Sequence, residues 1–289
     1  MRFTFHRMSD IAFLGTGLLG AALAEAAAKR GNRVTVWNRT TAKAKALEQF
    51  GVHVADSPAA AVRGATRVHL VLKDDAVVED VVSALRPGLD PSTIIADHTT
   101  TQPKLTAARV KRLNADGVKY IHCPVFIGPA AARKQHGTIM ASGPGQLFDA
   151  IRDGLTQMAE RVEYLGDRPD LAAVYKLCGN ALITGITGLV ADVFAIASGA
   201  GVASSDALNV TDFISPSAIV AGRGRNMAAG NFAPAFELEM ARKDVRLMIE
   251  TAGDVPLAML GSLANRMDAL IASGHGAEDL AVLGIESRN

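Results

Sequence analysis

A glycine-rich stretch near the start of the chain is the first pattern that could do chemistry. Its three glycines fall at the GxGxxG spacing, directly after one apolar run and before a stretch of helical length. In that setting the backbone can approach a pyrophosphate closely, and the free N–H groups of the helix start can bind it. The alternative is a glycine-rich turn that binds nothing. We expect six residues to contact a dinucleotide here: Gly15, Thr16, Gly17, Leu18, Leu19 and Gly20.

The segment after the next apolar run bears on the form of that dinucleotide. It reads Asn38-Arg39-Thr40 and contains no carboxylate that could bind a ribose 2′-hydroxyl and repel a 2′-phosphate. Arg39 could pair with such a phosphate, and Asn38 and Thr40 could donate hydrogen bonds to it. These residues favour NADP(H), although Arg39 could also be a solvated loop charge. Leu72 and Lys73, at the end of a later run, are further expected contacts.

Lys176 and Asn180 form a second candidate group. Their i, i+4 spacing places both side chains on one face of a helix. If that face looks toward the carboxyl ends of the strands, Lys176 could protonate a carbonyl oxygen and Asn180 could orient it or the substrate. A lysine suits this role because its pKa shifts readily when its ammonium group is desolvated. On spacing alone, a solvated lysine on the helix surface is the favoured interpretation.

The elements that must position these residues alternate in the first half of the chain. Ala-rich stretches of helical length, such as 18–29 and 41–50, separate the early apolar runs. This order predicts a doubly wound parallel sheet, which the runs at 138–141 and 162–165 would extend. The principal predicted strands are 11–14, 34–37, 68–72, 93–96 and 120–123.

The pattern changes after Pro169. Residues 170–200 contain no proline and predict one long helix, and the remainder carries helical patterns without further alternating strands. We therefore expect an α/β Rossmann-type domain at residues 1–167 and an all-α C-terminal domain at 168–289 that serves substrate binding and dimerisation.

Composition excludes several classes of function. The 30 Lys and Arg against 29 Asp and Glu give a net charge of +1, which predicts neither a nucleic-acid nor a membrane partner. The two cysteines, Cys123 and Cys178, lack metal-ligand or disulfide spacing, so we expect no metal and a cytoplasmic location. No uninterrupted apolar run reaches the roughly 18 residues of a spanning helix, and residues 1–8 are expected to be a disordered leader.

Four ordered motifs beyond the glycine-rich stretch resemble the β-hydroxyacid dehydrogenase family, which includes 3-hydroxyisobutyrate dehydrogenases and glyoxylate/succinic semialdehyde reductases. Residues 97–103, Asp-His-Thr-Thr-Thr-Gln-Pro, look like the cofactor-contacting D-x-S-T-x-x-P motif and place Thr100 at the cofactor. Residues 124–128 stand where the family has its substrate motif P-V-S-G-G. The segment 176–180 looks like the catalytic K-L-x-x-N motif, and residues 242–244 resemble the segment whose lysine, here Lys243, lies near the nicotinamide.

The resemblance implies a reaction and its residues. Hydride would pass between NADP(H) and a carbonyl or hydroxy compound, namely an aldehyde, semialdehyde or oxo acid, with Lys176 as general acid or base and Asn180 as its catalytic companion. This corresponds to an NADP-dependent dehydrogenase acting on alcohol groups. It also implies a homodimer formed through the long helix, whose apolar residues point to several sides. The implied substrate residues are Pro124, Phe126, Ile127 and Gly128.

The substrate motif departs from the family pattern. Phe126 replaces a small hydroxyl residue and Ile127 replaces a glycine, so the loop offers an apolar face where a carboxylate would be bound. One interpretation is that the substrate is a bulkier or less charged carbonyl compound. The other is that Phe126 simply packs in the core. Imine reduction on the same scaffold and a non-catalytic NADP(H)-sensing module are the alternative functions. Another, milder departure is Asp192, where the family often has Glu.

Overall fold

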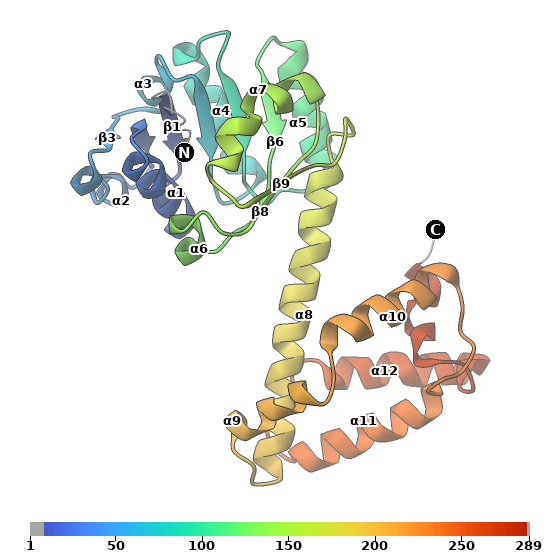
Figure 1. Ribbon diagram of the computed structural model, residues 1–289. Coiled ribbons are helices and arrows are strands. Elements are labelled where there is room, and N and C mark those ends of the chain that lie inside the picture. The colour runs from blue at the N-terminus through green and yellow to red at the C-terminus, as the bar shows by residue number, and fades with distance from the viewer. Residues whose placement is uncertain (1–8, 288–289) are drawn as a thin grey trace, which may run out of the picture. The chain divides into compact units, whose positions relative to one another are not determined.

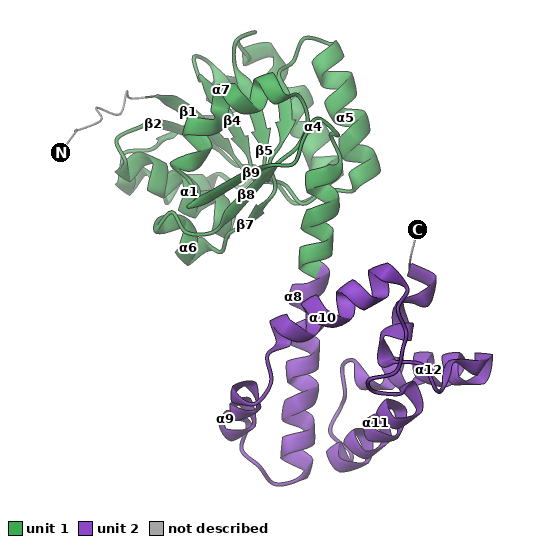
Figure 2. Cartoon of the chain, turned by 45° about the vertical axis from the view of Figure 1, so that its right-hand side comes forward, with its two compact units in different colours: residues 1–180 green, residues 181–289 purple. Residues whose placement is uncertain are grey.

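The computed structural model describes residues 9–287 of the chain, so the expected leader at residues 1–8 lies outside the described residues. The chain divides into two compact units, and the division falls inside one long helix, between Asn180 and Ala181 (Figure 2). The predicted domain boundary at residue 167 stays a prediction.

A six-stranded parallel sheet forms the centre of the first unit, in the order β3-β2-β1-β4-β5-β6, with helices on both faces (Figure 1). Alternate residues of β1 serve different cores: Phe13 packs with Leu23 of α1 on one face, and Leu14 packs with Leu70 on the other. The strands are β1 (Asp10–Leu14), β2 (Arg33–Trp37), β3 (His53–Val54), β4 (Arg67–Leu70), β5 (Ile94–Asp97) and β6 (Tyr120–His122).

The expectation that the later runs extend this sheet is wrong. They pair instead in a separate three-stranded sheet of order β7-β8-β9, in which β7 is antiparallel to β8. The physical reason lies at Pro124, which has no N–H to donate and lies two residues after the end of β6, so the chain leaves the first sheet there. The three strands are β7 (Val125–Phe126), β8 (Thr138–Ala141) and β9 (Arg161–Tyr164).

The helices of the first unit flank these sheets. The expected helix over 41–50 is split, because α2 ends at Lys45 and a short 3-10 helix covers Glu48–Phe50 before the left-handed Gly51. The other helices are α1 (Leu18–Lys29), α3 (Pro58–Val62), α4 (Asp75–Leu85), α5 (Pro103–Ala115), α6 (Pro129–Arg133) and α7 (Gly145–Thr156), and α2 begins at Thr41.

The predicted long helix is α8 (Leu171–Gly199), and no strand follows it within the described residues. The second unit is helical around a core in which Leu238 and Val245 pack with Leu260 and Met267. Its helices are the second part of α8, α9 (Ser204–Ala207), α10 (Pro216–Ala229), α11 (Leu238–Ala252) and α12 (Leu260–Leu270), with shorter helical turns at Leu208–Asp212, Ile271–His275 and Leu280–Ser287. This agrees with the fold class predicted from the sequence.

One buried carboxylate organises the second unit. Asp192 of α8 accepts hydrogen bonds from the backbone N–H groups of Ala258 (2.5 Å), Met259 (2.9 Å) and Leu260 (2.8 Å), where α12 begins. A carboxylate at a helix N-terminus satisfies donors that have no partner within the helix. Asp192, which departs mildly from the family pattern, therefore fixes α12 to α8.

Candidate active site

The three glycines of the loop between β1 and α1 serve different purposes. Gly15 has a φ of +98°, and an added Cβ would lie 2.2 Å from the carbonyl oxygen of Val71. A Cβ on Gly20 would lie 2.0 Å from the carbonyl oxygen of Gly15, so both glycines are needed for the turn itself. A Cβ on Gly17 would meet nothing within 4 Å. The protein alone therefore gives no reason for a glycine at this position.

The N-terminus of α1 is available to an anion. Gly17 is its N-cap residue, with no side-chain hydrogen bond to the first turn and no acidic residue in that turn. Leu18, the first helical residue, is 84% exposed, whereas Leu19 and Gly20 pack inward. Thr16 is buried, and its hydroxyl has no hydrogen-bond partner among the described residues. The free N–H groups and the positive end of the helix dipole fit a pyrophosphate.

A cavity of about 570 Å³ adjoins this loop and collects most of the expected cofactor residues. Sequence reasoning missed Lys43, which adds a cation beside Arg39, and Trp37, which adds an aromatic surface. Asp80 of α4 is the acidic member of the lining. The predicted residues in the lining are Gly15, Gly17, Asn38, Arg39, Thr40, Leu72 and Lys73.

Asn38 has a different task from the one expected. Its side-chain oxygen accepts a hydrogen bond from the N–H of Thr16 at 3.0 Å, and its amide nitrogen donates to the carbonyl of Thr40 at 2.9 Å. The side chain therefore joins the glycine loop to the end of β2. Arg39, Thr40 and Lys43 are left as the lining residues suited to a 2′-phosphate.

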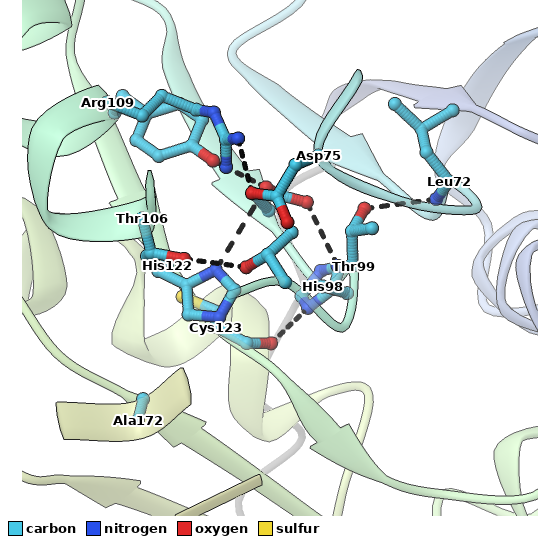
Figure 3. Close-up of polar contacts among 12 residues, drawn as sticks. Leu72, Asp75, His98, Thr99, Thr106, Arg109, His122, Cys123 and Ala172 are labelled. Atoms are coloured by element: carbon cyan, nitrogen blue, oxygen red, sulfur yellow. Dashed lines mark hydrogen bonds and ion pairs between the residues drawn. The ribbon is translucent and has the colours of Figure 1, made fainter. Parts of the chain in front are cut away.

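The segment after β5 is built as a hydrogen-bonded turn (Figure 3). The N–H of Thr99 donates to the Asp97 carboxylate at 2.9 Å, and the Thr99 hydroxyl accepts from the N–H of Leu72 at 3.1 Å. Tyr120 also donates to Asp97, whose pKa is raised by burial. Thr100 alone among residues 97–101 is exposed. It is therefore the side chain of this turn with access to a ligand.

A line of buried side chains holds the start of the next loop. Arg67 Nε donates to His69 Nε2 at 2.8 Å, His69 Nδ1 lies 2.8 Å from His98 Nε2, and His98 Nδ1 lies 2.6 Å from the carbonyl oxygen of Cys123. Because Arg67 only donates and the carbonyl only accepts, each ring must carry its proton on Nδ1. This chain of hydrogen bonds crosses β4, β5 and the end of β6, and it fixes the start of the loop that leads to Phe126.

His122, at the end of β6, differs from these two. It is fully buried, and neither ring nitrogen has a hydrogen-bond partner among the described residues. Its Nδ1 lies 4.0 Å from the Asp97 carboxylate, which is too far for a hydrogen bond. Burial lowers its pKa to about 3, so the ring is neutral. A structural histidine is the interpretation that fits.

Lys176 lies in the first part of α8, where the start of the helix is anchored by the N–H of Ala172, which donates to the Ser142 hydroxyl at 2.9 Å. Its ammonium nitrogen lies 4.2 Å from the centre of the Phe126 ring. Partial burial lowers the pKa of Lys176 below its usual 10.5. Asn180 follows one turn later, also partly buried. The expected catalytic lysine and the altered substrate residue are therefore in direct contact.

The other residues predicted to bind substrate or cofactor lie in different environments. Ile127 is partly buried and packs against the core of the first unit, and Gly128 is exposed at the start of α6. Pro124 is buried. Lys243 belongs to the second unit, on α11, and pairs with Asp244 at 2.8 Å. Its expected place near the nicotinamide stays a prediction.

Comparison with known proteins adds two family matches that together cover most of the chain. The NAD binding domain of 6-phosphogluconate dehydrogenase matches residues 10–166. The family described as the NAD-binding domain of NADP-dependent 3-hydroxyisobutyrate dehydrogenase matches residues 171–284.

Individual relatives carry the names of different reductive enzymes. Glyoxylate/succinic semialdehyde reductase 1 of Arabidopsis thaliana is 28% identical over 258 residues, covering 86% of this chain and 89% of that protein. The NADPH-dependent reductive aminase of Aspergillus oryzae is 27% identical over 288 residues, covering 94% and 95%. A solved imine reductase from Pseudomonas sp. has a TM-score of 0.86 at 23% identity, over 96% of this chain and 98% of that one, and this shows a shared fold.

Proposed function

Because the chain belongs to the β-hydroxyacid dehydrogenase family of NAD(P)-dependent oxidoreductases, we propose that it uses NADPH to reduce a carbonyl or imine group, with Lys176 as the proton donor. The observation that carries the cofactor preference is the cavity beside the glycine loop. Arg39 and Lys43 line it, and no carboxylate follows β2. A 2′-phosphate fits such a site better than a 2′-hydroxyl does.

The residues present fit the base and phosphate parts of the dinucleotide. Trp37, Val77 and Val81 supply apolar lining for a base, and the N-terminus of α1 supplies N–H groups for phosphates. The lack of neighbours around Gly17 leaves its backbone open to close approach. When bound, the reduced nicotinamide supplies hydride to an electrophilic carbon.

In this reaction the protein's side chains supply the proton. Lys176 would hold its proton toward the substrate oxygen or nitrogen and release it as negative charge develops there. Partial burial of the ammonium lowers the pKa of Lys176, which makes it a stronger acid than a solvated lysine. Asn180, on the same face of α8, would orient the substrate or Lys176 by hydrogen bonding.

Trp37 provides the measurement that tests the cofactor preference, because it is the only tryptophan and lines the cavity. NADPH and NADH are titrated while Trp37 fluorescence is followed. Arg39→Ala and Lys43→Ala should each weaken NADPH binding by about 10-fold or more, since each removes one charged contact. NADH affinity should change little. Exposed Lys45, on the same helix as Lys43 and outside the lining, gives the control Lys45→Ala.

A second experiment separates an enzyme from a cofactor-sensing module. NADPH oxidation is measured with glyoxylate, semialdehydes, aromatic aldehydes and cyclic imines, for wild type and Lys176→Met. The proposal expects turnover in wild type and a loss of about 100-fold or more in the variant, with NADPH affinity unchanged. Binding without turnover on any compound would support the sensing module. Turnover confined to cyclic imines would assign the protein to imine reduction, as the relationship to a reductive aminase suggests.

We also propose that α8 pairs with a second copy of the chain. The helix is long and apolar enough to cross a membrane by length and composition, yet only 11% of its most apolar 18-residue window is buried. Leu182 (51% exposed), Ile183 (56%) and Ile186 (43%) form part of this uncovered surface. Such a surface needs a partner. A dimer mass in dilute solution without detergent would support pairing, and a monomer that binds lipid vesicles would refute it.

A further inference from the structure

Phe126 occupies a position that bears on the choice of substrate. It is the second residue of β7, and its ring is only partly buried, so it is not part of the central core. The Lys176 ammonium nitrogen stands over the ring face at 4.2 Å from its centre. A cation within about 6 Å of an aromatic face is attracted by the electron-rich ring. The ring therefore covers one side of the expected proton donor.

Gly179 makes this arrangement possible. A Cβ there would lie 2.2 Å from Cζ of Phe126 and 2.8 Å from Cε1, which is closer than any real contact. The edge of the ring thus rests directly on the backbone of α8, three residues after Lys176. A glycine inside a helix costs about 1 kcal/mol relative to alanine. The helix carries a glycine at the one turn where the ring needs space.

Gly185, in the same helix, shows that this is a local requirement. A Cβ at Gly185 would meet nothing within 4 Å. Space for the Phe126 ring is therefore provided at Gly179 and is not a general property of the glycines in α8. Contact on the Lys176 side and contact on the Gly179 side together determine where the ring lies.

We propose that Phe126, seated on Gly179, is a specificity-determining residue that makes the site select uncharged substrates with an apolar group beside the reacting carbon over oxo acids. A substrate carboxylate placed against the Phe126 ring would meet an apolar surface and lose water without gaining a hydrogen bond from that residue. An alkyl or aryl group would pack on the same ring. This inference rests on the function proposed above, since it takes Lys176 as the group that faces the substrate.

A matched pair of aldehydes tests the inference by turnover. Butanal and succinic semialdehyde have the same chain length and differ by a terminal carboxylate. Wild type should have the higher kcat/KM for butanal, and Phe126→Ser should shift the ratio toward succinic semialdehyde by about 10-fold or more. Phe126→Leu retains apolar bulk and should keep the preference for butanal. An active Phe126→Ser variant with an unchanged ratio would overturn the inference.

The contact with Gly179 gives a second, independent arm. Gly179→Ala should displace the ring and shift the ratio in the same direction as Phe126→Ser, while Gly185→Ala should leave it unchanged. In the Phe126→Ser background, Gly179→Ala should add little, because the ring with which the new methyl collides is gone. Equal effects of Gly179→Ala in both backgrounds would show that the ring does not act through this contact.

A binding measurement tests the inference independently of turnover. Butyrate and butyramide are titrated into the NADP⁺ complex by calorimetry. Phe126→Ser should improve butyrate affinity relative to butyramide by about 10-fold, with NADP⁺ affinity unchanged. If wild type binds NADPH and turns over none of the compounds, the proposed function fails while this ratio still tests Phe126. If turnover is normal and neither ratio moves, the inference fails and the proposed function stands.

Discussion

Replacing His122 by leucine should make the stability of the protein less sensitive to acid. His122 is fully buried, and burial lowers its pKa from 6.5 to about 3, with the nearby Arg109 charge acting in the same direction. The folded state therefore keeps the ring neutral, while the unfolded chain takes up a proton below pH 6.5. Stability contributed by the neutral ring is fully present above that pH and is lost as pH falls toward the folded pKa.

The size of the effect follows from these two pKa values. At about pH 5 the unfolded histidine is almost fully protonated and the folded one is not, which lowers the free energy of unfolding by about 2 kcal/mol compared with about pH 7.5. Leucine cannot take up this proton, so the variant loses less stability. His69 and His98 stay in both proteins, and their contributions cancel in the difference. At neutral pH the leucine also removes two ring nitrogens that have no hydrogen-bond partner among the described residues.

Urea unfolding at both pH values, with linear extrapolation to water, measures this difference. The stability of His122→Leu relative to wild type should rise by about 2 kcal/mol between about pH 7.5 and about pH 5. His53 is exposed on β3, so His53→Leu serves as the control and should show no comparable change. A His122→Leu difference that is the same at both pH values would show that the ring is not held neutral, and the reasoning from burial would be refuted.

Three further predictions concern the cofactor loop, the second unit and the proton donor. Gly20→Ala should lower the free energy of unfolding by about 1–3 kcal/mol because its Cβ collides with backbone. Gly17→Ala should leave the apoprotein stable and weaken NADPH binding by about 10-fold or more. Thermal melts with and without NADPH separate the two effects. Asp192→Asn should cost about 2–4 kcal/mol, since charged acceptors for three N–H groups are lost, while Asp206→Asn, at an exposed site, should cost little; urea unfolding measures both. The rate of carbonyl reduction should fall as pH rises through the pKa of Lys176, which burial lowers below 10.5, and a kcat/KM profile that rises across that range would contradict its role as an acid.

The cofactor half of the molecule could be predicted largely from local patterns. The glycine loop follows a strand and opens α1 over the predicted residues 18–29, because the turn and the start of the helix are formed by residues that are neighbours in the sequence. The long helix was also predictable from its apolar content and lack of proline. Lys43 was missed because a lysine in a short, exposed helix has the same pattern as a solvated surface charge.

The substrate side depends on contacts between distant parts of the chain. An apolar run such as 138–141 indicates a strand but not its partner, so the separate sheet formed with β7 could not be foreseen. The two readings of Phe126 could not be resolved either, because the ring's neighbours Lys176 and Gly179 lie far along the sequence. The ring lies neither fully in the core nor fully exposed in a loop. Only the folded structure shows this.

In the chain of hydrogen bonds from Arg67 to the carbonyl of Cys123, every donor points toward Cys123. This common direction gives the protein a spectroscopic signature. Both His69 and His98 must carry their proton on Nδ1, the nitrogen at which each ring donates toward the next acceptor. The ring ¹⁵N resonances of these two histidines therefore report, without any ligand, whether the segment before Phe126 is in place. A variant that frees the Cys123 carbonyl would leave His98 without its acceptor, and its ring signals would register the change before any loss of the sheet.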